Sequence, residues 1–412
     1  MTQPKTTRIL AIALIGGLAA YALIQHQAQV ELRAQNVSLQ QQSEQMARLC
    51  AAFRATWSET VAEASSRLSE TVTIDCASDL GPFTHCGSGF LYGFSSDGSR
   101  PSDGLAAPLK VRLHRARIED TLAQAGRMQT LGVQQQIVVS DAWGYNGAYP
   151  GDHGNWGKWE KFIRQQLDLV RKAGVRPQLD LWNEPDHGAF WKRTPEQFIE
   201  TWVRACRIVR AVEPSAVIVG PSWSNVHPGQ RRFDEFLLYC RAHGALPDYI
   251  TWHFPKDTPG EVRACREFCA REGIQVKGIL INEYCNAHEQ TAANTAWHLA
   301  QLERARVDGA CHAVWDDTRH YDLDGILLGN APRGQWWVYR RYAEMEGRLL
   351  GATPSANVEA AAAADSRART LNVLLGRRGG TGLRVVVRLD HLDALPFLAG
   401  EGSVRIMGEQ IP

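Results

Sequence analysis

The chain has 412 residues, enough for two or three domains of ordinary size or for one barrel with smaller additions. Its 45 Lys and Arg residues balance 44 Asp and Glu residues, which leaves a formal net charge of +1. Because no long basic run stands out from this balance, the composition argues against nucleic acid as a partner.

The N-terminal segment predicts export. Lys5 and Arg8 precede an uncharged apolar run over residues 9–24, a pattern that keeps the N-terminus in the cytoplasm. The run is longer than a signal-peptide core and shorter than the roughly 20 residues of an ordinary span. We favour an uncleaved single-pass anchor over residues 1–29. Because Ala20-Tyr21-Ala22 resembles a cleavage site, secretion after signal cleavage stays open, and in both cases the rest of the chain is periplasmic or extracellular.

Residues 30–75 are predicted to form a helical stalk. The segment has no Pro or Gly, and apolar residues recur in it at spacings of three and four: Leu49, Phe53, Trp57, Val61, Ala64, Leu68 and Val72. This spacing indicates an amphipathic helix of roughly 60 Å. Its apolar stripe would serve self-association as a coiled coil, docking, or packing on the domain that follows.

Eight short apolar runs predict strands after residue 82, and helical patterns separate most of them. The strands are expected at 88–93, 109–114, 135–140, 176–182, 216–221, 248–253, 278–283 and 310–316, and the helices between them at 158–173, 195–212, 230–243, 259–272 and 290–307. From residue 182 to 316 the strand ends recur every 30 to 40 residues, about the length of a βα unit. The predicted fold class is therefore α/β, with a (β/α)8 TIM barrel over residues 76–350.

The C-terminal residues 351–412 predict a small β-sandwich-like domain. A final helix is expected over 335–347, followed by an alanine-rich linker at 355–365. Residues 369–390 indicate two strands joined by a Gly-rich turn, and residues 402–411 would complete the domain.

The nine cysteines are scattered along the chain. Cys76 and Cys86 flank a loop-like segment and are candidates for a disulfide in an oxidising compartment. Cys265 and Cys269 have helical spacing and are interpreted as helix residues rather than metal ligands. The acidic, histidine-containing loop over 312–324 lacks recognised ligand spacing, so neither a metal nor a cofactor is expected.

Two predicted strands end in the same dipeptide. Glu184 follows Asn183 in LWNEPD, and Glu283 follows Asn282 in LINEY. In a barrel both carboxylates would face the carboxyl ends of the strands, where barrel chemistry takes place. Two carboxylates about 5 Å apart are typical of a retaining glycoside hydrolase, in which one protonates the leaving oxygen and the other attacks the anomeric carbon.

These motifs resemble glycoside hydrolase clan A, whose members are retaining enzymes, and within it most closely family 39. The similar stretches are VRLH at 111–114, NEPD at 183–186, WHFP at 252–255, INEY at 281–284, WDD at 315–317 and DGILL at 324–328. The resemblance implies that Glu184 is the general acid/base and Glu283 the nucleophile. It also implies that Asn183 contacts the sugar 2-hydroxyl.

The resemblance implies further contacts around the nucleophile. Arg112 would lie beside Glu283 and lower its pKa. His114 and His253 would form the floor of the sugar subsite, and Trp315 its aromatic wall. One departure concerns the hydroxyl partner of the nucleophile: Pro255 stands where the clan often has a tyrosine, so Tyr284 or Tyr145 would have to replace it.

Tryptophans near the strand ends favour a carbohydrate ligand. Five lie at or just past predicted strands: Trp143, Trp182, Trp223, Trp252 and Trp315. Aromatic rings stack on the apolar faces of sugars, although packing in the barrel would explain some of these residues equally well. Because successive side chains of a strand point to opposite faces, Trp182 and Trp252 are expected to face away from the site residues next to them in the sequence.

The sequence therefore predicts a membrane-anchored, exported glycoside hydrolase acting on an extracellular polysaccharide. Family 39 includes β-xylosidases, α-L-iduronidases and membrane-tethered enzymes that cleave exopolysaccharides. An endo-acting enzyme on an exopolysaccharide is the first expectation, and an exo-acting β-xylosidase-like enzyme is the second. The alternative from another class is a non-catalytic carbohydrate-binding subunit of a secretion or biofilm complex.

Overall fold

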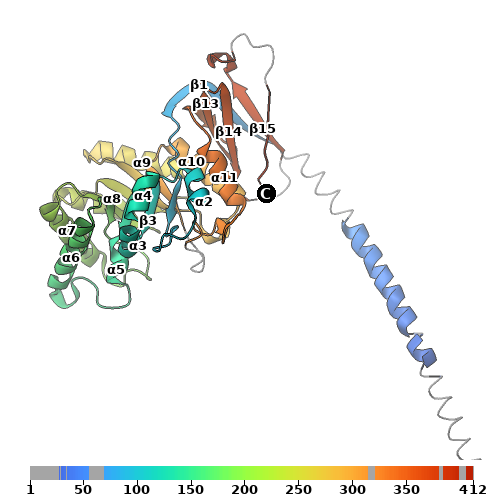
Figure 1. The fold of residues 1–412 in the computed structure, drawn as a ribbon, viewed down its shortest axis with the longest axis horizontal. Coiled ribbons are helices and arrows are strands. Elements are labelled where there is room, and N and C mark those ends of the chain that lie inside the picture. The colour runs from blue at the N-terminus through green and yellow to red at the C-terminus, as the bar shows by residue number, and fades with distance from the viewer. Residues whose placement is uncertain are drawn as a thin grey trace, which may run out of the picture. The chain divides into compact units, whose positions relative to one another are not determined.

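The computed structural model of the protein describes residues 27, 29–33, 35–54, 69–313, 321–379, 384–398 and 405–411. The chain divides into two units, one comprising residues 1–69 with 380–384 and the other residues 70–379 with 385–412. The first contains a helix over residues 27–54, and the second contains a barrel and a sheet (Figure 1).

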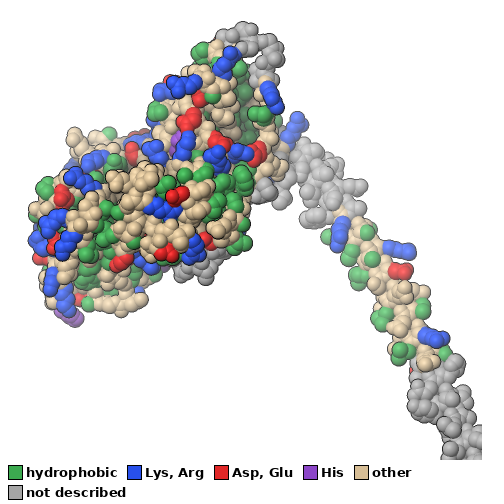
Figure 2. Space-filling view, in the orientation of Figure 1, with side chains coloured by type: hydrophobic (Ala, Val, Ile, Leu, Met, Phe, Trp, Pro, Cys, Tyr) green, Lys and Arg blue, Asp and Glu red, His purple; other side chains and the backbone are tan. Residues whose placement is uncertain are grey.

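The described side chains of the helix over 27–54 are exposed, and hydrophobic ones are visible along its surface (Figure 2). The large apolar ones are Val30, Leu32, Val37, Leu39, Met46, Leu49 and Phe53. The predicted stalk is therefore helical to residue 54, while its stretch over 55–68 lies outside the described residues. None of the helices in the described part of the chain has both the length and the apolar character needed to cross a bilayer. The predicted anchor at 9–24 also lies outside the described residues.

Eight parallel strands close into the predicted barrel. They are β2 (Gly89–Leu91), β3 (Leu113–Ala116), β4 (Gln134–Val138), β5 (Gln178–Asp180), β6 (Val217–Trp223), β7 (Tyr249–His253), β8 (Gly278–Tyr284) and β9 (Gly309–His312). Each of the eight predicted runs contributes one strand. The run at 109–114 is displaced, because Ala107–Leu109 form a 3-10 turn that ends at Lys110 with a φ of 48°. The strand there begins only at Leu113.

The barrel helices agree with the sequence pattern. The α-helices described between residues 70 and 379 are α2 (Asp103–Ala106), α3 (Ile118–Ala123), α4 (Ala125–Leu131), α5 (Val139–Trp143), α6 (Gly157–Ala173), α7 (Pro195–Val212), α8 (Arg231–Ala242), α9 (Thr258–Glu272), α10 (Ala292–Ala305) and α11 (Gly334–Ala343). A short hairpin of β10 (Leu327–Leu328) and β11 (Ala331–Pro332) precedes α11. Cys265 and Cys269 lie buried on α9, as expected. Cys76 and Cys86 are buried free thiols, so the predicted disulfide is wrong in this structure.

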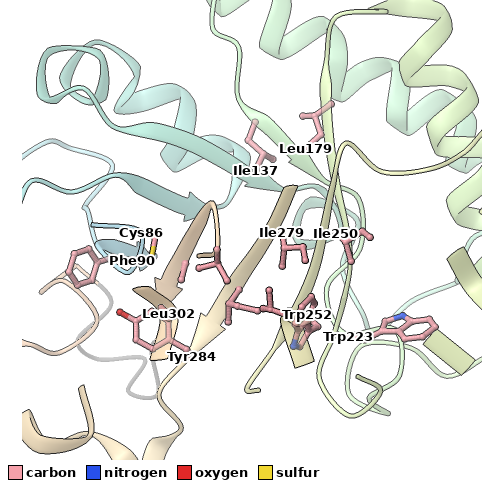
Figure 3. Close-up of a cluster of buried hydrophobic side chains, with 14 of the residues drawn as sticks. Cys86, Phe90, Ile137, Leu179, Trp223, Ile250, Trp252, Ile279, Tyr284 and Leu302 are labelled. Atoms are coloured by element: carbon pink, nitrogen blue, oxygen red, sulfur yellow. The ribbon is translucent and has the colours of Figure 1, made fainter. Parts of the chain in front are cut away.

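Alternation along the strands separates an apolar outer face from a polar interior. Ile137, Leu179, Ile250 and Ile279 belong to the hydrophobic core (Figure 3). Several of their neighbours on the opposite face are polar, as in Asp180 beside Leu179, although Leu280 beside Ile279 is apolar. Burying the outer side chains under the helices fixes the register of the strands, since a shift by one residue would exchange the two faces.

Bulges change this alternation near the carboxyl ends of two strands. Ser222 is an extra residue of β6 relative to β7, with a φ of 56°. Strand β8 likewise gains one residue between Ile281 and Tyr284 relative to β9. A bulge re-aims the side chains beside it. As a result Asn282 and Glu283 both face the barrel interior, although they are consecutive.

A five-stranded sheet accompanies the barrel, in the order β14 (Thr370–Arg377), β13 (Val358–Asp365), β12 (Arg348–Thr353), β1 (Ser69–Pro82) and β15 (Arg384–Asp390). It corrects several expectations. Residues 69–75 are strand rather than stalk helix, residues 358–365 are a strand rather than a linker, and β14 and β15 lie at opposite edges instead of forming a hairpin. Residues 405–411 form no strand.

The alanine-rich strand β13 is explained by its position against a helix. Ala360 to Ala364 are buried, and β13 and β14 contact α10. In β14, a Cβ at Gly376 would lie 1.8 Å from the backbone nitrogen of Trp297 on α10. Alanine has low β-propensity, so composition alone indicated a linker. The small side chains instead allow the sheet to approach α10 closely.

Candidate active site

The two predicted glutamates meet at the carboxyl ends of the strands. Glu184 follows β5 and Glu283 lies in β8; each is 7% exposed. One carboxylate oxygen of Glu184 lies within 4.8 Å of one of Glu283. Retaining glycoside hydrolases hold their carboxyl groups about 5–5.5 Å apart, and inverting enzymes about 6.5–9.5 Å apart. The observed proximity fits the retaining geometry.

The backbone holds Glu184 in an uncommon conformation. Its φ is 44°, in the left-handed region that glutamate rarely adopts. The amide of Glu184 donates a hydrogen bond to the carbonyl of Ser222 over 3.0 Å, and the amide of Asn183 donates to Ser140 Oγ over 2.9 Å. These bonds offset part of the conformational cost, and such strain is concentrated at functional sites.

Arg115, not the predicted Arg112, contacts the nucleophile candidate. Its Nη1 donates to Glu283 Oε1 over 2.6 Å, and its Nη2 donates to Asn183 Oδ1 over 2.7 Å. Arg112 precedes β3 and is exposed. Since residues three apart on a strand point to opposite faces, only one of these two arginines can face the interior.

Asp180 holds Arg115 in place from inside the barrel. Its Oδ2 accepts hydrogen bonds from Nε and Nη2 of Arg115, over 3.0 and 2.7 Å, and both side chains are about 1% exposed or less. Ser222 Oγ and Asn282 Nδ2 also donate to the Asp180 carboxylate. A buried charge pair needs such additional hydrogen bonds to offset its desolvation. The network fixes the guanidinium beside Glu283.

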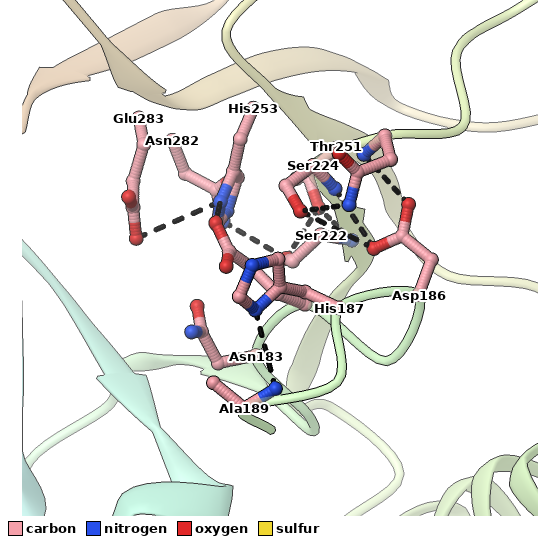
Figure 4. A network of polar contacts seen from close by, with 12 residues as sticks. Asn183, Asp186, His187, Ala189, Ser222, Ser224, Thr251, His253, Asn282 and Glu283 are labelled. Atoms are coloured by element: carbon pink, nitrogen blue, oxygen red, sulfur yellow. Dashed lines mark hydrogen bonds and ion pairs between the residues drawn. The ribbon is translucent and has the colours of Figure 1, made fainter. Parts of the chain in front are cut away.

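His253 lies close to both glutamates, and Figure 4 shows its ring beside Glu283. Its Nδ1 is 2.8 Å from Glu184 Oε1 and 3.6 Å from Glu283 Oε1. Burial lowers the pKa of His253 to about 4, so the imidazole is neutral near pH 7. The predicted His253 therefore lies in the site, where it contacts the acid/base candidate.

The surroundings of the two glutamates favour different protonation states. Burial raises the pKa of Glu184 to about 7, which keeps a proton available near neutral pH. Burial also raises the pKa of Glu283, so the predicted lowering is wrong as a net effect, but His253 and Arg115 oppose that rise. Of the two carboxylates, Glu283 accepts the hydrogen bond from the Arg115 guanidinium. The geometry thus favours a protonated Glu184 beside an ionised Glu283.

A cavity of about 910 Å³ opens over this pair, with Asn183, Glu184 and Glu283 in its wall. Its aromatic lining residues are Tyr92, Phe190 and Phe254. None of the tryptophans in the described residues lines it. Trp182, Trp223 and Trp252 are buried in the core, and Trp143 packs on Trp159 and Phe162. The fifth candidate, Trp315, lies outside the described residues.

Three further predicted residues are not among those that line the cavity. His114 neighbours the inward-facing Arg115 and packs on Phe94, with ring centroids 5.1 Å apart. Tyr284 follows the bulge and donates its hydroxyl hydrogen to the Gly87 carbonyl over 2.7 Å. Tyr145 donates to Asp141. Neither tyrosine replaces the hydroxyl that Pro255 lacks, and the described partners of Glu283 are Arg115 and His253.

The donor atoms of Glu184, His253 and Glu283 lie within 4.8 Å of one another, close enough for a metal ion. Arg115 argues against this use, because its guanidinium already contacts Glu283 over 2.6 Å and would repel a cation.

An eight-stranded barrel with paired glutamates at the carboxyl ends of its strands is the arrangement expected of a retaining glycoside hydrolase. Residues 159–314 match the family model described as Glycosyl hydrolases family 39, and this segment contains both glutamates. This segment of the barrel is therefore similar to family 39.

Individual relatives agree with this class. The 3-O-alpha-D-galactosyl-alpha-L-arabinofuranosidase of Bifidobacterium longum subsp. longum is 23% identical over 410 residues, which cover 80% of this chain and 36% of that protein. The chain thus spans about a third of the length of this curated relative.

Solved structures share the fold. A protein from Neocallimastix frontalis is 25% identical, with a TM-score of 0.68 over 79% of this chain and 85% of that one. A family 39 β-xylosidase from Caulobacter crescentus is 16% identical, with a TM-score of 0.54 over 78% and 84% of the two chains.

Proposed function

We propose that this protein cleaves glycosidic bonds of a polysaccharide or oligosaccharide by a retaining, two-step mechanism. The observation that carries the proposal is the asymmetric pair: Glu184 and Glu283 lie within 4.8 Å, and Arg115 donates a hydrogen bond to Glu283. This arrangement gives a proton donor and an anionic nucleophile on either side of a scissile bond.

In the first step, Glu184 donates its proton to the glycosidic oxygen while the Glu283 carboxylate attacks the anomeric carbon. The leaving group departs as an alcohol, and the sugar remains bound to Glu283 as an ester. In the second step, Glu184 removes a proton from water, which attacks the anomeric carbon and releases Glu283. The pKa of about 7 suits Glu184 to both proton transfers.

Asn183 positions the sugar in this scheme. Its Oδ1 accepts a hydrogen bond from Arg115, which leaves the amide NH2 to donate to the substrate. Asn183 also lines the cavity next to both glutamates. A donor at this place can bind the 2-hydroxyl, whose contact strengthens as the transition state forms.

For the location, we propose an exported protein held by the apolar N-terminal segment with its barrel outside the cytoplasmic membrane. The charge pattern before residues 9–24 supports this orientation. Such a tethered barrel suits an extracellular polysaccharide, with endo-acting cleavage proposed ahead of exo-acting cleavage. The names of the relatives add arabinofuranosides and xylosides to the substrates to be tested.

The test is hydrolysis of bacterial exopolysaccharides, arabinan, xylan and aryl glycosides by the purified full chain, beside Glu184→Gln and Glu283→Gln. Chain shortening or aryl release that is lost in both variants supports the hydrolase. Nuclear magnetic resonance of the first product distinguishes retention from inversion. Intact polymer bound equally by all three proteins would instead support the carbohydrate-binding subunit.

A further inference from the structure

A second polar group lies in the wall of the same cavity, away from the Arg115 network. It consists of Asn286, Glu289, His298 and Arg378, here called the Glu289 cluster. Asn286 and Glu289 follow β8, His298 lies on α10, and Arg378 directly follows β14. The antiparallel sheet therefore contributes a residue to the cavity of the barrel.

Glu289 is a buried carboxylate whose two oxygens contact the other members of the cluster. It is 3% exposed, and its Oε2 accepts from the Asn286 amide over 2.9 Å and lies 3.1 Å from His298 Nε2. Its Oε1 is buried and forms an ion pair with Arg378. Burial alone would raise the pKa of Glu289, but its contacts with His298, Asn286 and Arg378 outweigh burial and lower it to about 2.

Arg378 is held over this carboxylate in a fixed position. Its Nη2 lies 2.8 Å from Glu289 Oε1, and its guanidinium carbon lies 5.0 Å from the centroid of the Trp297 ring. The side chain is nevertheless 43% exposed. Because a guanidinium has five N–H donors in a rigid plane, this placement leaves donors for a ligand and reduces the entropy lost on binding.

The chemistry of the cluster matches sugar hydroxyls. A sugar hydroxyl can accept from the exposed N–H groups of Arg378, which the buried Glu289 carboxylate holds in place. The ion pair compensates its own charge, which favours an uncharged sugar over an acidic one. The cavity of about 910 Å³ is at the upper end of the range for small-molecule sites, so it has room for more than one ring.

We propose that the Glu289 cluster is a second sugar-binding subsite that binds a neutral pentose or hexose unit of the same chain whose bond is cleaved at Glu184 and Glu283. This inference rests on the proposed function. It makes the sheet part of the substrate-binding surface and the preferred substrate an oligosaccharide or polymer rather than a single glycoside.

The test compares Arg378→Ala and Glu289→Gln with the unmodified full chain on substrates of different length. The probes are 4-nitrophenyl α-L-arabinofuranoside and β-D-xyloside, and arabino- and xylo-oligosaccharides of two to five units. In both variants, kcat/KM for the oligosaccharides is expected to fall about 10-fold further than for the aryl glycosides, mainly through KM, as for one lost charged hydrogen bond. Equal losses on short and long substrates would overturn the subsite.

Arg388→Ala is the matched control, since Arg388 is an exposed arginine of the same sheet that pairs with Asp390. It is expected to retain the activity of the unmodified chain on every probe. Thermal unfolding of all variants detects a general loss of fold, which would lower activity on short and long substrates alike.

Binding separates failure of the subsite from failure of the proposed function. Calorimetric titration of the oligosaccharides into Glu283→Gln, with and without Arg378→Ala, needs no turnover. An affinity that falls about 10-fold with Arg378→Ala supports the subsite even if no probe is hydrolysed. An affinity unchanged by Arg378→Ala, or no binding of any oligosaccharide to Glu283→Gln, contradicts it.

Discussion

The dipeptide Asn-Glu occurs at the ends of β5 and β8, yet the two copies have different structures. After β5 the strand has ended, and both Asn183 and Glu184 line the cavity. In β8 a bulge turns both residues inward, but Asn282 is buried below the cavity, where its Nδ2 donates to Asp180, Ser222 and Gln136. Only Glu283 of the second pair lines the cavity.

The shared Asn-Glu motif does not distinguish the acid/base from the nucleophile, but the contacts of each glutamate do. The Arg115 guanidinium donates to Glu283, whereas His253 Nδ1 lies closest to Glu184. A cationic donor favours the anionic form of its partner, and burial without one favours the protonated form.

The largest expected effect is on the glutamates themselves. Glu283→Gln should lower kcat more than about 10⁴-fold on every substrate, because it removes the nucleophile. Glu184→Gln should lower it about 10²–10⁴-fold on natural glycosides but far less on dinitrophenyl glycosides, whose leaving group needs no protonation. Steady-state kinetics on both substrate types measures these losses. An equal loss of kcat in the two variants on dinitrophenyl glycosides would contradict the assignment of Glu184 as the acid/base and Glu283 as the nucleophile.

Arg115→Lys should have the next largest effect. A lysine cannot donate to Asp180 and Glu283 in the way that the planar guanidinium does, so kcat/KM is expected to fall about 10²-fold. Because Arg115 lowers the pKa of Glu283, the acidic limb of the pH profile should move to higher pH. Arg112→Lys is the matched control at the exposed position. An unmoved acidic limb in Arg115→Lys would show that the guanidinium does not set the ionisation of the nucleophile.

The pH dependence of stability should reveal Glu184. Burial raises the pKa of Glu184 in the folded state from 4.5 to about 7, so the folded chain binds this proton more tightly than the unfolded chain. The stabilisation of the folded state by this proton is fully present below pH 4.5 and is lost as the pH rises towards 7. Glu184→Gln should therefore be more stable than the unmodified chain above pH 7, by roughly 3 kcal/mol. Urea unfolding at pH 5 and pH 8 measures this, and a pH-independent difference would contradict the raised pKa.

The smallest effects should separate the two asparagines. Asn183→Ala is expected to lower kcat/KM about 10-fold, because its amide donates to the substrate. It should lower stability less than Asn282→Ala, because Arg115 keeps its hydrogen bonds to Asp180 and Glu283. Asn282→Ala should lower the free energy of unfolding by about 1–3 kcal/mol, since it leaves the Asp180 and Ser222 groups with fewer partners. Activity assays and urea unfolding of both variants test this difference. Equal losses of activity and equal losses of stability in the two variants would contradict it.

The sequence predicted the barrel because apolar strand runs and amphipathic helices recur with the length of a βα unit. It also predicted Glu184 and Glu283, since polar residues directly after buried strands stand out. Arg115 was missed because β3 begins only at Leu113, after a turn with a positive φ at Lys110 that no local pattern announces. An inward residue cannot be assigned until the first residue of its strand is known.

The remaining errors concern packing between distant segments. Tryptophans near strand ends fit a sugar site by composition, but Trp182, Trp223 and Trp252 fill the space between strands and helices. The alanines of β13 have low strand propensity and become a strand because small residues fit against α10. Nothing local in residues 69–82 predicts their pairing with β12, some 270 positions later.

Strand β1 also determines how mechanical load would reach the barrel. It lies between β12 and β15 in the sheet, and its residues precede the barrel in the chain while those of β12 follow it. A force applied to residues before 69 therefore acts first on the β1–β12 and β1–β15 hydrogen bonds, and only afterwards on the strands that hold Glu184 and Glu283.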